Sequence, residues 1–83
     1  MRLLYFGWVR AKIGVSGETI DPPDGVDDVR SLVDWLSARG GGYGEALGDT
    51  TAIRVAVNQE LAELDAAIAA GDEVALFPPM TGG

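Results

Sequence analysis

The stretch VRSLVDWLSARG, Val29–Gly40, decides the fold that the sequence predicts. Its apolar residues recur at the spacing of one face of an α-helix and form a single stripe: Val29, Leu32, Val33 and Leu36. Asp27 or Asp28 can cap the first turn and oppose the positive end of the helix dipole. Gly40 can adopt the left-handed conformation that ends a helix. We therefore expect one long amphipathic helix whose apolar stripe packs against a core.

Apolar segments on both sides of this helix predict a sheet. Two strands precede the helix and three follow it: Arg2–Val9, Ser16–Ile20, Ile53–Val57, Glu60–Leu64 and Glu73–Phe77. The first is almost continuously apolar, which is typical of a strand buried on both faces. Asn58-Gln59 separates the third and fourth strands and predicts a tight hairpin turn.

The segments between these elements carry weaker signals. Arg10–Gly14 could form one helical turn, and Ala66–Ala70 a short helical or 3₁₀ turn. Gly40–Gly44 predicts a flexible connection that leads into a short turn around Glu45–Leu47. Its glycines superficially resemble a phosphate-binding loop, but the G-K-[ST] ending of such loops is missing.

The order of elements predicts an α+β fold. The first and last strands are the most apolar, so we expect them side by side at the centre of a mixed sheet. One main helix can cover only one face of that sheet. This is the β-grasp, or ubiquitin-like, architecture. We expect a single domain over residues 1–83 with a flexible C-terminal tail over residues 78–83.

Composition excludes several classes of function. The 83 residues contain no cysteine and no histidine, which excludes thiolate nucleophiles, disulfides and Cys/His zinc sites, and we expect no bound metal. The net charge of −7 argues against nucleic-acid binding, which needs a basic surface. No apolar run approaches the roughly 18 residues of a membrane span, and no cleavage site follows the N-terminal apolar segment. We expect a cytoplasmic protein without membrane contact.

The uncovered face of the predicted sheet is a candidate partner interface. If Val74 and Leu76 face the helix, the alternation of strand side chains leaves Phe77 on the open side. Phe6 and Leu61 could join it there, and an open apolar patch is usually a contact surface. The alternative is that these residues fill a satellite core under the glycine-rich loop. Arg10, outside the sheet, is a further candidate for partner contact, although a solvated surface position explains it as well.

The last seven residues, FPPMTGG, form the second candidate site. Pro78 and Pro79 favour an extended backbone and end the strand. Gly82 and Gly83 lack side chains, so this backbone could thread a narrow tunnel. Met80 and Thr81 between them could contact the tunnel wall.

Three segments together resemble a known family. LLYFGWVR near the N-terminus, VNQEL and GDEVALFPPMTGG occur in the order found in the small, sulfur-carrying subunits of molybdopterin synthase. The resemblance spans nearly the whole chain, and the F-P-P-x-[TS]-G-G ending is its most specific part. Ala11, where such proteins often carry Glu, and the glycine-rich loop depart from the pattern.

The resemblance implies a function for the tail. An E1-like enzyme would use ATP to adenylate the carboxylate of Gly83, and a sulfur donor protein would convert it to a thiocarboxylate. The chain would bind no cofactor and catalyse no chemistry itself. Its tail would deliver sulfur to cyclic pyranopterin monophosphate in the active site of the large subunit, which builds molybdopterin. A dimeric large subunit with two carriers would form a heterotetramer.

Three alternatives remain open from the sequence. The chain could carry sulfur for another pathway, such as thiamine thiazole synthesis. It could be a ubiquitin-like modifier that is joined through Gly83 to lysines of other proteins. It could also be a plain interaction module with an inert tail. Fold alone does not separate these functions.

Overall fold

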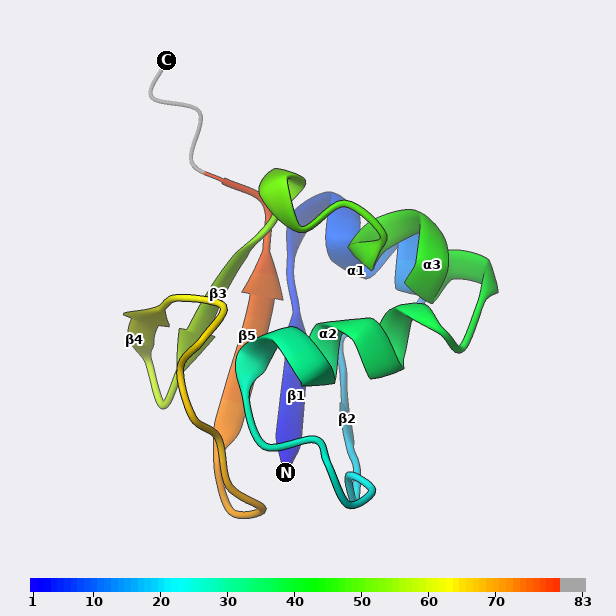
Figure 1. Ribbon diagram of the computed structural model, residues 1–83. Helices are drawn as coiled ribbons and strands as arrows, with labels where there is room; N and C mark the ends of the chain where they lie inside the picture. Colours follow the sequence, from blue (N-terminus) through cyan, green and yellow to red (C-terminus); the bar gives the residue numbers. More distant parts are fainter. Residues whose placement is uncertain (80–83) are drawn as a thin grey trace.

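The computed structural model describes residues 1–79, which form a five-stranded sheet with α-helices packed on one side (Figure 1). The strands are β1 Arg2–Tyr5, β2 Gly17–Thr19, β3 Arg54–Val57, β4 Glu60–Ala62 and β5 Glu73–Phe77. The helices are α1 Gly7–Ile13, α2 Val29–Ser37, α3 Gly41–Leu47 and the 3₁₀-helix η1 Thr50–Ala52. None of the helices in this part of the chain is long and apolar enough to cross a membrane.

The strand order β2-β1-β5-β3-β4 confirms the predicted β-grasp architecture. β1 and β5 are parallel neighbours at the centre, with Leu3 opposite Val74 and Tyr5 opposite Leu76. The other neighbouring pairs are antiparallel. The first strand of the chain therefore lies next to the last one, β5, which is the central strand of the sheet. Residue 78 follows directly after the end of β5.

α2 confirms the helix that the apolar spacing predicted. All four residues of its stripe are fully buried, as are Val74 and Leu76 of β5. Asp28 rather than Asp27 caps the helix: its carboxylate accepts a hydrogen bond from the Ser31 N–H at 2.8 Å, and the Ser31 hydroxyl accepts from the Asp28 N–H in return. Such reciprocal caps contribute about 1 kcal/mol. The helix ends at Ser37 with Ala38 as its C-cap. Gly40, the predicted left-handed stop, has a positive φ of +79°, but its ψ of −169° lies outside the left-handed helical region.

The N-terminal apolar run is not one strand. β1 ends at Tyr5, and α1 begins at Gly7, whose φ of +57° turns the chain out of the sheet. The prediction of a strand through Val9 was wrong because a short buried helix and a buried strand give the same unbroken apolar pattern. Val9 is buried from α1 rather than from the sheet.

The glycine-rich segment is also a helix. α3 occupies Gly41–Leu47 and buries Ala46 and Leu47, so the expected flexible connection is wrong. A Cβ on Gly42 would overlap the carbonyl oxygen of Lys12 in α1. Glycine here serves close packing of two helices rather than mobility.

The segment after β4 contains no helix. Leu64 and Ala66 instead give their carbonyl oxygens to the first two N–H groups of α2, those of Arg30 and Val29, at 2.9 and 3.0 Å. Ala67 forms an isolated bridge with Asp28. The expected turn at Ala66–Ala70 was wrong because the N-terminus of α2 takes the hydrogen bonds that a local turn would have used.

Candidate functional site

An apolar row crosses the sheet face that α2 leaves uncovered. Leu4, Ala75, Ala56 and Leu61 are register partners on four successive strands. They alternate along their strands with core residues, so their side chains lie on the opposite face. The first three are half-buried, whereas the side chain of Leu61 is 79% exposed. The row is a continuous apolar surface on an otherwise acidic protein.

The aromatic residues expected on this face lie at one end of it. Phe77 is half-buried and stands opposite Arg54, one position beyond the fully buried Leu76. Phe6 follows β1 in extended conformation and is 49% exposed. The alternative placement of Phe77 and Leu61 under the glycine-rich segment does not fit, because that segment is α3 and packs against α1 and α2.

Leu4 and Ala56 were missing from the sequence-based list of interface residues. Only the register of the strands identifies them, because it places Leu4 and Ala56 on either side of Ala75.

Arg10 lies outside this face. It is exposed on α1, in the last turn of that helix, together with Lys12. α1 packs against β5 and α3, so both basic side chains are carried on the element next to the end of β5. Their contact with a partner stays a prediction.

The start of the tail packs against the turn between β1 and α1. The Phe6 N–H donates to the Leu76 carbonyl at 3.1 Å, which continues the parallel pairing one step beyond the strands. A Cβ on Gly7 would lie 2.7 Å from Cγ and 2.9 Å from Cδ of Pro78. Gly7 therefore allows the proline ring to lie directly on the backbone, a role that no local sequence pattern indicated.

The predicted strand end before Pro78 is confirmed, since β5 stops at Phe77. Pro78 and Pro79 are both half-buried. The other tail residues assigned from the sequence, Met80, Thr81, Gly82 and Gly83, lie outside the described residues.

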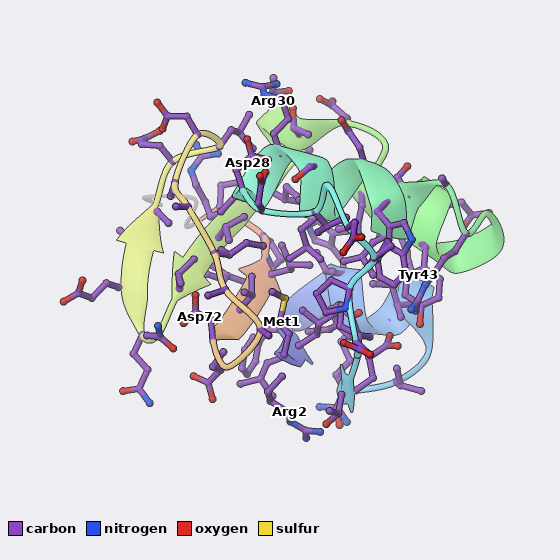
Figure 2. The ribbon with its side chains drawn as sticks, turned by 60° about the horizontal axis from the view of Figure 1, so that its bottom comes forward. Met1, Arg2, Asp28, Arg30, Tyr43 and Asp72 are labelled. Atoms are coloured by element: carbon purple, nitrogen blue, oxygen red, sulfur yellow. The ribbon has the colours of Figure 1, made fainter. Side chains whose placement is uncertain are left out.

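Glu18 holds together the elements on the other side of the core. Its carboxylate accepts hydrogen bonds from the hydroxyls of Tyr5 and Tyr43 at 2.8 and 2.5 Å and from the Arg39 guanidinium at 2.8 Å. Arg39 also stacks over the rings of Trp35 and Tyr43, 4.6 and 4.9 Å from their centroids. Figure 2 shows Tyr43 on α3, beside α2. One side chain from β2 thus joins β1, α3 and the segment after α2.

The charges in this cluster shift each other's pKa values. Burial opposes ionisation of Glu18, but the hydrogen bonds from Arg39, Tyr43 and Tyr5 outweigh it and lower the pKa of the carboxyl. Burial, followed by the hydrogen bond to Glu18, raises the pKa of the Tyr5 hydroxyl well above its usual range. Glu18 is therefore an ionised structural anchor at neutral pH rather than a proton donor.

A groove is the main concavity beside the open face. It has a volume of about 510 Å³, lies beside β4 and is lined by residues 50, 51, 53–55 and 61–64. Within residues 1–79, no three histidine, cysteine, aspartate or glutamate side chains gather as metal ligands. The geometry provides a docking face and a supported root for the tail.

The chain matches a protein-family model over nearly its whole length and curated proteins over all of it. The model described as the ThiS family matches residues 3–83. A protein from Haemophilus influenzae named molybdopterin synthase sulfur carrier subunit is 35% identical over 83 residues, which cover all of this chain and 99% of that protein.

Solved structures with a similar fold include a modifier protein and a complex of two subunits. SAMP1 from Haloferax volcanii, the small archaeal modifier protein 1, is 34% identical with a TM-score of 0.74, and the match covers 100% of this chain and 98% of that one. A complex of subunits 1 and 2 of molybdopterin-converting factor from Helicobacter pylori contains a chain that is 25% identical with a TM-score of 0.66, and the match covers 99% of this chain and 96% of that one.

Proposed function

The chain belongs to the ThiS family, and from that premise we propose that it is the sulfur-carrier subunit of a molybdopterin synthase. The observation that carries the proposal is the end-to-end similarity to curated sulfur-carrier subunits, at about 35% identity. The Helicobacter pylori complex of subunits 1 and 2 supports a second subunit that binds a chain of this fold.

The proposed chemistry takes place at the Gly83 carboxylate. A carboxylate oxygen attacks the α-phosphorus of ATP on an E1-like enzyme, and pyrophosphate leaves. A hydrosulfide ion supplied by a donor protein then attacks the acyl carbon, AMP leaves and the sulfur loses its proton, so that a thiocarboxylate replaces the carboxylate. The adenylate makes a poor electrophile reactive, and the thiocarboxylate sulfur is a nucleophile near neutral pH.

The fold supports delivery of this sulfur to the large subunit. The apolar row and Phe77 provide a surface that a partner can cover, which fixes the carrier's position. The seating of Pro78 on Gly7 fixes the direction in which the tail leaves β5. A stiff lead reduces the conformational entropy lost when the tail enters an active site. In this proposal, the groups that catalyse sulfur transfer to cyclic pyranopterin monophosphate belong to the large subunit.

The first experiment follows the mass of the intact chain. Incubation with its activating enzyme, ATP and a sulfur source should raise the mass by the difference between sulfur and oxygen. Addition of the large subunit and the pterin precursor should reverse this gain. A variant with one residue appended after Gly83 should keep its fold and show no gain. Molybdopterin formation by the extended variant would contradict the proposal.

The SAMP1 structures favour a second candidate function, that of a protein modifier. Both functions would start from the same adenylate and differ in the group that attacks it. A sulfur donor gives a thiocarboxylate, whereas a lysine amine gives an isopeptide bond. Lys12 is the only lysine in the sequence and is exposed on α1. Conjugates with other proteins that depend on Gly83, found by mass spectrometry of cell extracts, would establish the modifier function.

A further inference from the structure

We propose that the free edge of β4 pairs with an extended, basic segment of the large subunit, so that the partner adds a sixth strand to the sheet. This inference rests on the proposed function, because it assigns the occupant to the protein that receives the tail. It adds a backbone-mediated contact to the apolar open face.

The hairpin geometry determines which backbone groups of β4 are free. Asn58 and Gln59 form a two-residue turn with φ values of +51° and +70°, so Val57 and Glu60 are the hydrogen-bonded pair that flanks it. Pairs alternate along an antiparallel ladder, which directs the N–H and C=O of Leu61 away from β3. β4 is an edge strand, and no group in residues 1–79 bonds to this outward N–H or C=O.

The free edge of β4 lies two strands away from β5, where the tail begins. The Leu64 carbonyl accepts from the Arg30 N–H of α2 at 2.9 Å, which draws the chain away from β3 after Ala62. The groove of about 510 Å³ lies in the resulting gap between β3 and β4, on the inner side of β4. Arg54 lines it and stands opposite Phe77 in the sheet. A protein that binds the tail can thus reach past Arg54 and the groove to the outer edge of β4.

Side chains along the edge specify the chemistry of that segment. Leu61 is 79% exposed, which provides an apolar contact for one residue of an added strand. Glu63, the first residue after β4, is exposed, as are Glu60 and Asp65. We therefore expect an apolar residue flanked by lysine or arginine. A second copy of this chain fits poorly, because it would bring the same acidic residues and a net charge of −7 to the contact.

The opposite edge of the sheet provides a matched control. Met1 and Ile20 exchange hydrogen bonds of 3.0 and 2.9 Å, so the neighbouring Thr19 of β2 also directs its N–H outward. β2, however, carries no exposed large apolar side chain. Proline at either position removes one outward N–H without removing a bond of the sheet.

The test measures binding of the full chain to the large subunit from the same organism by calorimetry. Leu61→Ala removes the side chain alone, and Leu61→Pro also blocks the edge. We expect L61P to bind at least about tenfold more weakly than L61A, which corresponds to about 1.4 kcal/mol, and Thr19→Pro to bind within about twofold of wild type. Equal affinities of L61A and L61P, or an equal loss in T19P, would overturn the inference while leaving the proposed function intact. A wild-type chain that does not bind would overturn both.

Two further measurements identify what pairs with the free edge of β4: the effect of reversing the charge of Glu63 on binding, and the oligomeric state of the chain alone. Glu63→Lys should weaken binding about fivefold or more, whereas Glu45→Lys, the same change on α3, should have a smaller effect. A Glu63→Lys variant that binds as tightly as Glu45→Lys would contradict a basic segment. Sedimentation of the chain alone should show a monomer, and a dimer that L61P abolishes would assign the edge to a second copy instead.

Amide exchange of the wild-type complex gives a readout that does not depend on variant folding. The Leu61 amide should exchange at least about tenfold more slowly in the complex than in the free chain, while the Thr19 amide should not change. An unprotected Leu61 amide in the complex would overturn the inference.

Discussion

Gly7 is the residue at which the fold and the proposed delivery of the tail depend on each other. Its φ of +57° turns the chain from β1 into α1, and its missing Cβ leaves room for the Pro78 ring. A side chain would impose both an unfavourable backbone conformation and a steric overlap. The two effects can be separated, because Gly14 has a φ of +95° with no atom within 4 Å of where its Cβ would be.

The Gly7→Ala variant should lose both stability and sulfur transfer, whereas Gly14→Ala should lose stability alone. We expect G14A to cost about 1 kcal/mol through its positive φ and G7A to cost about 2–3 kcal/mol, because the Pro78 overlap is added. A displaced tail root should also slow sulfur delivery by about tenfold. Urea unfolding and mass spectrometry of the thiocarboxylated chains measure the two effects. Equal transfer rates in G7A and G14A would refute the role of the Gly7–Pro78 contact.

At the scale of elements, the helix and strands with a regular apolar pattern were predicted from the sequence. The helix that depends on close packing against another helix was not. α2 and the central β1–β5 pair follow from apolar spacing, because each buries a regular stripe or an alternating face. The helix α3 was missed because its four glycines, at 41, 42, 44 and the capping position 40, are typical of loops. Gly42 is helical there because its backbone packs against Lys12 of α1, a contact that no local pattern reveals.

The site was predictable to a similar extent. Alternation along the last strand predicted Phe77 on the open face and Leu61 as a residue that could join it, and the structure places both there. Leu4 and Ala56 needed the strand register. The free edge at Leu61 needed both the strand order and the two-residue turn. Tertiary pairing, rather than residue type, defines these parts of the surface.

Gly42→Ala tests whether the α1–α3 contact is as tight as the backbone geometry indicates. The added methyl would overlap the Lys12 carbonyl, so the helices must separate at a cost of about 3 kcal/mol. This should lower the melting temperature by about 12–24 °C for a domain of this size. Gly44→Ala is the matched control, since its Cβ would meet only the Ser37 carbonyl at 3.4 Å and the change favours the helix by up to about 1 kcal/mol. An unchanged melting temperature in G42A would show that the two helices adjust freely.

At the scale of the whole molecule, polar contacts at opposite sides connect segments that are distant in sequence. Glu18 joins β2 to β1, α3 and Arg39. Asp28, at the start of α2, joins that helix to the chain after β4 (Figure 2). Asp72 accepts from the Asn58 side chain at 3.0 Å and from the Ala69 N–H at 2.8 Å, which ties the hairpin turn to the start of β5. Each of these carboxyls has a lowered pKa.

These lowered pKa values predict how the stability of the fold depends on pH. A carboxyl whose pKa is lower in the folded state contributes stability above its unfolded pKa, and this contribution is lost as the pH falls through the folded pKa. The free energy of unfolding should therefore be level near pH 7 and fall below about pH 4.5, the range in which unfolded carboxyls bind protons. Glu18 should account for a large share of the loss, because three donors depend on its charge.

The Glu18→Gln variant isolates this share. At pH 7 it should be less stable than wild type by about 1–2 kcal/mol, because the ion pair with Arg39 is lost and the hydrogen bonds from the two tyrosines no longer have a charged acceptor. The difference should narrow as the pH falls below about 4.5, since Glu18 of the unfolded wild-type chain then binds a proton that the folded chain, with its lowered pKa, binds less readily. Glu45 is exposed on α3 and makes no side-chain hydrogen bond within residues 1–79, so Glu45→Gln should have the same stability as wild type at each pH. Urea unfolding at pH 7, 5, 4 and 3 measures all three chains. A gap between wild type and E18Q that stays constant down to pH 3 would show that the shape of the Glu18 side chain, rather than its charge, holds the elements together.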